Sequence, residues 1–214
     1  MSARSDVEIA PARARGVGRP RRHEADALDR LILDAARRSF LARGFALTTI
    51  ERVAVDCGTT RRTVTNRFAD KDALLLAVVE VVLTRDLAAV LTVDPALPPA
   101  GLLHEFCRRL LAYATDPLQY GMFRVFLGEI VRLPEIGRAL MAHHDHLIAE
   151  IEGTARRAQA LGDFPDRSSE EVANGVIGLM LANPVNRAMM GDSRFHDARE
   201  IERYFGEMWA TLIR

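Results

Sequence analysis

Apolar residues recur along most of the chain at spacings of three and four, which places them on one face of an α-helix. From about Ala25 to Arg43 they form a single stripe, and Gly44 provides a stop signal because glycine readily takes the left-handed conformation that ends helices. Similar stripes follow over most of the remaining sequence. The pattern predicts an all-α protein.

The next segment predicts two short helices joined by a turn. The sequence TTIE places Thr48 as the N-cap of a helix, with Glu51 three residues later as its capping-box partner. This helix is expected to run toward Gly58, where a positive φ allows a sharp turn. A short third helix starts near Thr60 and is anchored by Val64 and Phe68, which lie four residues apart on one face.

Asp70 is expected to cap a long apolar helix that reaches about Val93. Further helices are predicted at about 101–115, 117–132, 134–161, 168–190 and 197–213, separated by proline- and glycine-containing segments. We therefore expect a flexible basic arm at residues 1–24, a three-helix domain with a helix-turn-helix at 25–71, and a larger helical domain at 72–214.

The chain has no net charge, but its charge is unevenly distributed. Residues 1–71 contain 15 lysines and arginines against 9 acids, whereas residues 72–214 contain 14 against 20. The sequence CGTTRRTVTNRFA, at positions 57–69, contains no acid. Arginine pairs with guanine and asparagine with adenine in the major groove, so the short third helix has residue types suited to reading double-stranded DNA.

The sequence TTIERVAVDCGTTRRTVTNRFADKDALLLAVV resembles the N-terminal helix-turn-helix of TetR-family transcriptional regulators, and the resemblance covers roughly residues 27–80. It implies a DNA-binding domain followed by a domain that binds a small molecule and dimerises. Thr48, Thr49 and Lys71 are then expected to contact phosphates. The residues expected in or beside the groove are Thr59, Thr60, Arg61, Arg62, Thr63, Thr65, Asn66 and Arg67.

The sequence MFRVFLGEIVRLPEIGRALM resembles the AefR-like C-terminal domain. An effector cavity in this half needs an apolar lining with a few polar groups. The candidates are Phe106, Tyr113, Phe123, Phe126, Leu127, Ile130, Met141, His143, Ile148 and Met180, although ordinary core packing explains each of them more readily than a cavity does.

The last two helices have more apolar surface than one side of a bundle needs, which predicts a homodimer. The candidate interface residues are Val172, Val176, Leu179, Ile201, Phe205, Met208, Trp209 and Leu212. Two subunits would place two recognition helices on a palindromic operator. The expected function is a repressor that a small-molecule effector releases from this operator.

Other features exclude several classes of function. His143 and His146 lie one turn apart in the sequence HHDH, but no third or fourth ligand is evident, so we expect no metal and no cofactor. No nucleophile and base show a catalytic arrangement, which argues against an enzyme. Two isolated cysteines and the lack of a long apolar run indicate a cytoplasmic protein without membrane contact. The alternative is a helical small-molecule-binding or catalytic protein that shares the fold but does not bind DNA.

Overall fold

The structure is a computed structural model that describes residues 22–86, 88, 92–164 and 166–213. These residues form helices, turns and loops with no strand among them, which confirms the all-α prediction. None of the helices in the described ranges is both long and apolar enough to cross a bilayer. The basic arm predicted at residues 1–24 lies outside the described residues except for 22–24, which belong to the first helix.

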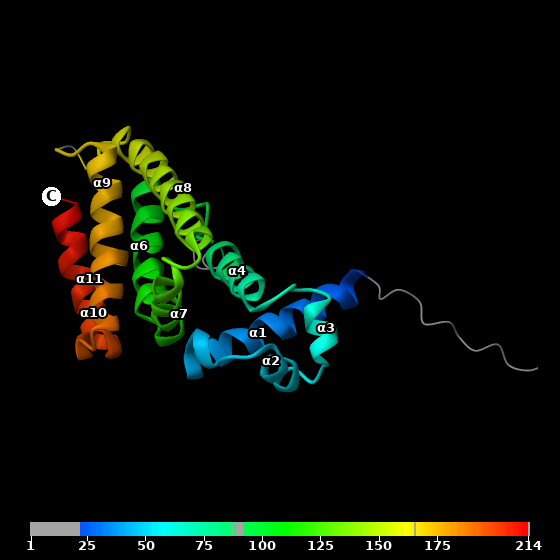
Figure 1. The fold of residues 1–214 in the computed structure, drawn as a ribbon. Coiled ribbons are helices and arrows are strands. Elements are labelled where there is room, and N and C mark those ends of the chain that lie inside the picture. The colour runs from blue at the N-terminus through cyan, green and yellow to red at the C-terminus, as the bar shows by residue number, and fades with distance from the viewer. Residues whose placement is uncertain (1–21, 87, 89–91, 165, 214) are drawn as a thin grey trace, which may run out of the picture.

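The first three helices form a compact group, coloured blue to cyan in Figure 1. Helix α1 (Arg22–Leu47) contains a break at Gly44, whose φ of 76° ends the regular helix where the sequence predicts a stop. Helices α2 (Ile50–Asp56) and α3 (Arg61–Thr65) follow. Gly58, with a φ of 69°, makes the turn between them. The structure therefore confirms the predicted helix-turn-helix.

The cap of α2 differs from the sequence-based prediction. Thr49, not Thr48, is the N-cap, and its side chain accepts a hydrogen bond from the backbone N–H of Arg52. Thr48 instead is buried, and its hydroxyl donates to the carbonyl oxygen of Gly44 at 2.9 Å. Threonine is a good N-cap residue at either position, and the capping-box spacing to Glu51 favours Thr48, but the burial of Thr48 against α1 leaves Thr49 as the cap.

Helix α4 (Lys71–Val81) connects the two groups of helices and continues into a π-helical segment, η1 (Val82–Asp86). Asp70 caps it as predicted, accepting a hydrogen bond from the backbone N–H of Ala73 at 2.8 Å. The predicted extension to about Val93 is wrong at its end, because residues 92 and 93 are not helical. A π-helical segment forms hydrogen bonds between residues five apart, and an apolar pattern does not reveal it.

The second group contains the remaining helices, and their bounds lie within a few residues of the predictions. Three of them are joined end to end over residues 169–189, where a π-helical segment interrupts the helix just before Pro184. The elements are α6 (Pro99–Thr115), α7 (Pro117–Glu129), α8 (Pro134–Gln159), α9 (Ser169–Val176), η2 (Ile177–Ala182), α10 (Asn183–Met189), η3 (Ser193–His196) and α11 (Ala198–Leu212).

Two hydrophobic cores hold these groups together. One lies among α6, α8, α9, η2 and α11. The other contains the buried faces of α1–α4 and also Met122, Phe126 and Ile136 from α7 and α8. The N-terminal helices thus share their core with the second group, which couples the positions of α1 and α4 to those of α7 and α8.

Candidate functional site

Helix α3 is held on the protein by one fully buried side chain and one half-buried side chain. Val64 has no exposed surface, and Phe68 packs against the same core, as their spacing predicts. Thr60 caps the helix by accepting a hydrogen bond from the backbone N–H of Thr63. These contacts fix a five-residue helix that is too short to be stable alone.

The outer face of α3 presents two arginines and an asparagine to solvent. Arg61, Arg62 and Asn66 are exposed. The side chains of Arg62 and Asn66 make no hydrogen bond or ion pair with the residues that the structure describes. Arg61 pairs with Glu51 of α2 at 2.7 Å, but both side chains are more than half exposed, so solvent screening makes this ion pair weak. The donors on this face are therefore available to a partner.

Three of the threonines predicted beside the groove already use their hydroxyl groups in hydrogen bonds within the protein. The hydroxyls of Thr60 and Thr63 hydrogen-bond to each other at 2.9 Å and lie on the exposed side of the helix. Thr65 turns its hydroxyl back onto the carbonyl oxygens of Arg61 and Arg62. Thr59, in the turn, is half-buried.

Two predicted DNA contacts are used within the protein. The guanidinium of Arg67 donates to the carbonyl oxygen of Ala25 and pairs with Asp29, both on α1. The ammonium of Lys71 donates to the carbonyl oxygens of Phe45 and Ala46 at 2.8 and 3.2 Å. Sequence spacing does not reveal these contacts because their partners lie 25 or more residues away along the chain.

Thr48 is a clear correction. Its side chain is 1% exposed and its hydroxyl lies 3.3 Å from that of Ser39 on α1. Such a side chain fastens α2 to α1 and does not reach a phosphate. Thr49, by contrast, is exposed at the start of α2.

A first contact between the two groups of helices surrounds Phe45. Lys71 at the start of α4 lies 4.2 Å from the centre of the Phe45 ring, and Arg132, just after α7, lies 4.7 Å from it. Arg132 also makes two hydrogen bonds to the carboxylate of Asp72, at 2.7 and 2.9 Å. These bonds hold the pKa of Asp72 below its ordinary value. The start of α4 is thereby tied to the end of α7.

A second contact joins α1 directly to α7. The guanidinium of Arg37 donates to the side-chain oxygen of Gln119 at 3.0 Å. Leu41, one turn further along α1, lies against Gly121, where an added Cβ would come within 2.9 Å of its methyl group. Glycine at this position therefore permits the close approach of the two helices.

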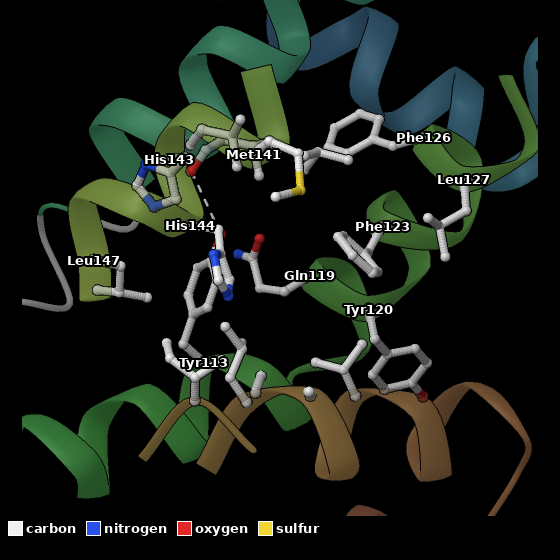
Figure 2. Close-up of a pocket in the computed structure, with 18 of the residues that line it drawn as sticks. Tyr113, Gln119, Tyr120, Phe123, Phe126, Leu127, Met141, His143, His144 and Leu147 are labelled. Atoms are coloured by element: carbon white, nitrogen blue, oxygen red, sulfur yellow. Dashed lines mark hydrogen bonds between the residues drawn. The ribbon is translucent and has the colours of Figure 1, made fainter. Parts of the chain in front are cut away.

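The second group contains a cavity of about 610 Å³, within the range of small-molecule sites. Its walls come from η1, α6, α7, α8, η2 and α10, and Figure 2 shows side chains from several of these elements around an open centre. Among the residues that the structure describes, no aspartate, glutamate, lysine or arginine lines it. The polar side chains that line it are Tyr113, Gln119, Tyr120, His143, His144 and Asn186.

Sequence reasoning found part of this lining. Phe106, Ile148 and Met180 do not line the cavity. They pack in or against the core among α6, α8, α9, η2 and α11. Gln119, Tyr120, His144, Leu147 and the η2–α10 residues were missed, since a helical pattern does not tell which face of each helix meets a void. The expected residues that do line it are Tyr113, Phe123, Phe126, Leu127, Ile130, Met141 and His143.

His143 is the most unusual polar group in the cavity wall. Its Nε2 atom is buried and has no hydrogen-bond partner among the described residues. Burial, with a smaller contribution from nearby His146, lowers the pKa of His143 below its ordinary value and favours the neutral imidazole. The described ranges contain no group of three or more His, Cys, Asp or Glu side chains able to hold a metal ion.

Half of the expected dimer contacts are buried within the single chain. Val172, Val176, Phe205 and Leu212 are at most 4% exposed and pack in the core between α9 and α11. They therefore hold the two helices to each other and are not available to a second subunit, which corrects the prediction. Leu179, Ile201, Met208 and Trp209 are half-buried.

A helix-turn-helix with an acid-free polar helix, followed by a helical unit with an apolar cavity, defines a DNA-binding transcriptional regulator. Residues 32–78 match the model of the tetR family of bacterial regulatory proteins, and residues 101–212, more than half of the chain, match that of the AefR-like transcriptional repressor C-terminal domain. The chain belongs to the TetR family, and its C-terminal half is of the AefR-like kind.

Solved structures show the same fold. A protein from Mesorhizobium loti MAFF303099 assigned to the TetR family has a TM-score of 0.77 at 24% identity, with 88% of this chain and 96% of that chain covered. A TetR regulator from Haloarcula marismortui has a TM-score of 0.74 at 18% identity, with 88% and 97% covered. A transcriptional regulator from Saccharomonospora viridis in complex with choline has a TM-score of 0.65 at 20% identity, with 86% and 94% covered. No curated protein matches the chain significantly.

Proposed function

We propose that this protein is a dimeric repressor whose α3 helices read a palindromic operator, and that a small molecule in the cavity releases it from DNA. The observation that carries the proposal is the outer face of α3, where Arg61, Arg62 and Asn66 are exposed and no acid lies between residues 57 and 69. Their donors and acceptors match the edges of guanine and adenine in the major groove.

A single α3 is too short to select one site in a genome. A dimer with two-fold symmetry reads two half-sites, which raises both affinity and specificity. In this proposal the second subunit meets the outward faces of η2 and α11, where Gly178 and Gly206, with no atom within 4 Å of an added Cβ, leave room for helices to approach closely. This surface replaces the buried residues that the sequence suggested.

The contacts between the two groups of helices supply a route from the cavity to α3. Gln119 lines the cavity and accepts the hydrogen bond from Arg37 on α1. Val82 and Leu83, also in the wall, directly follow α4. The first residue of α4, Lys71, donates a hydrogen bond to the end of α1. A ligand that fits only when these walls move would shift α1 and α4 and thereby the spacing of the two recognition helices.

The Saccharomonospora viridis regulator holds choline, a cation. The described part of the cavity wall contains no carboxylate, so we do not extend choline to this chain. The release mechanism requires only that the ligand prefer one of two conformations. A preference of about 1 to 3 kcal/mol corresponds to a 5- to 150-fold change in DNA affinity.

The test is a mobility-shift titration with the DNA that flanks the gene, using wild type and the Arg61→Ala, Arg62→Ala double variant. We expect the double variant to fold and to bind at least tenfold more weakly, because it loses two cationic groups on the recognition face. Arg156→Ala, Arg157→Ala is a matched control, since this adjacent exposed pair on α8 also includes a glutamate ion pair. Equal losses in both variants, or none in either, would contradict the assignment of α3.

A further inference from the structure

We propose that the effector is an uncharged, largely apolar molecule with an acceptor oxygen that binds the side-chain amide of Gln119, and that the imidazole of His143 is a second polar contact in the same cavity. The inference rests on the proposed function, because it names the ligand of the cavity described above. It draws on four properties of the cavity: its size, the lack of charge in its wall, the orientation of one amide, and one buried ring nitrogen.

The size limits the ligand. A volume of about 610 Å³ is that of roughly twenty water molecules in the liquid, and therefore accommodates on the order of twenty non-hydrogen atoms. Phe123, Phe126, Leu127 and Met141 supply much of the wall, and Figure 2 shows the three α7 residues on the side of the cavity opposite Leu147. A flat or branched apolar body fits such a lining.

The wall disfavours ligands with a full charge. A carboxylate or an ammonium group loses hydration on entering, and no side chain of opposite charge in the described wall residues replaces it. Arg37 lies behind Gln119 and is not part of the wall. Aromatic rings alone attract quaternary ammonium ions, so such a cation is the strongest competitor to the proposal.

The amide of Gln119 has a fixed orientation. A guanidinium has only donors, so the Gln119 oxygen must face Arg37, and the amide N–H groups remain for a ligand. Figure 2 shows this side chain reaching toward the centre of the cavity, near His144 and Met141. An N–H donor in an apolar cavity selects a ligand with an acceptor oxygen, such as a phenol, a ketone or an ester.

His143 provides the second polar contact. Its Nε2 is buried without a partner among the described residues, and such an atom costs free energy until a ligand or a water binds it. The neutral ring can donate or accept, so it pairs with a hydroxyl or a carbonyl group. The Gln119 side chain also accepts the hydrogen bond from Arg37. A ligand that binds the Gln119 amide therefore acts on the bond that joins α7 to α1.

The experiment compares four probes that share one apolar body: biphenyl, 4-phenylphenol, 4-phenylbenzoate and (4-phenylbenzyl)trimethylammonium. Calorimetric titration of the full-length protein at about pH 7.5 should give the lowest Kd for 4-phenylphenol. This Kd should be at least tenfold below the Kd of either charged probe. His143→Ala and Gln119→Leu should each weaken 4-phenylphenol about fivefold, the effect of one neutral hydrogen bond, and leave biphenyl nearly unchanged. The exposed His146→Ala is the control and should bind like wild type.

The comparison of head groups on wild type needs no variant to fold. A charged probe that binds as well as 4-phenylphenol overturns the proposed ligand class, as does failure of all four probes to bind. A separate mobility shift with 4-phenylphenol distinguishes this failure from that of the proposed function. Tight binding of the phenol without release of DNA would support the ligand class and contradict the release mechanism.

Discussion

The close approach of α1 and α7 at Gly121 leads to a sharp prediction about the junction between the two groups of helices. In Gly121→Ala the new Cβ would lie 2.9 Å from the Leu41 methyl group, closer than side-chain atoms normally come. Leu41 or one of the helices must therefore shift. Arg37 lies one turn before Leu41, so the same shift strains its bond to Gln119.

The magnitude follows from two opposing effects. Replacing glycine by alanine inside a helix stabilises it by roughly 0.5–1 kcal/mol, whereas overpacking a tight contact costs roughly 1–3 kcal/mol. We expect a net loss of about 1 kcal/mol for Gly121→Ala, because the methyl group of Leu41 can move part of the way. Gly128→Ala, in the same helix with no atom within 4 Å of its new Cβ, is the matched control and should be neutral or stabilising.

The assay is urea unfolding followed by circular dichroism, supported by thermal unfolding. A loss of about 1 kcal/mol lowers the Tm of a chain of this size by about 2–4 °C. Leu41→Ala should remove the clash, so the cost of Gly121→Ala should largely disappear in that background. Equal stability of Gly121→Ala and Gly128→Ala, each as a single variant, would refute the reasoning about the α1–α7 junction.

Three further predictions concern the cavity and the titrating groups. Gln119→Leu should bind DNA within about threefold of wild type but need about five- to tenfold more 4-phenylphenol for release, measured by mobility shift, because both the hydrogen bond to the ligand and the bond to Arg37 are gone. The pKa of His143 is lowered, so its burial costs stability as the pH falls below 6.5; His143→Leu should lose this part of the pH dependence in urea unfolding, and His146→Leu should keep it. Hydrogen bonds from two arginines lower the pKa of Glu105 from 4.5 to about 2, so its stabilisation is present above pH 4.5 and lost toward pH 2, and Glu105→Gln should lose less stability in acid than wild type.

Much of the fold follows from local sequence rules. The spacing of Val64 and Phe68 predicted how α3 is anchored, and Gly44, Gly58 and Asp70 marked the ends and starts of helices that the structure confirms. These features depend on residues within one or two turns. They can therefore be read without knowing the tertiary structure.

The sequence-based predictions are wrong where a contact with a residue far away in the sequence determines the position of a side chain. The spacing to Glu51 favoured Thr48 as the cap of α2, but Thr48 is buried against α1, where its hydroxyl lies beside that of Ser39, and Thr49 caps the helix. The residue type and position of Arg67 suggested a DNA contact, but in the structure its guanidinium pairs with Asp29 on α1.

The dimer and cavity predictions show the same limit. An apolar stripe predicts burial but not its partner, so Val172 and Leu212 were assigned to a second subunit although they pack within one chain. His144 and Gln119 were missed because the position of a void depends on how η1, α6, α7, α8 and α10 meet.

The measurement that tests the central claim most directly is a hydroxyl-radical footprint of the protein on the DNA flanking its gene. Two α3 helices related by a two-fold axis should protect two half-sites whose centres are about 10 base pairs, or a multiple of one turn, apart. Arg61→Ala, Arg62→Ala should abolish both protected segments together, and Arg156→Ala, Arg157→Ala should leave them unchanged. Protection that persists in the α3 variant, or that covers the DNA without regard to sequence, would contradict the assignment of α3 as the reading helix.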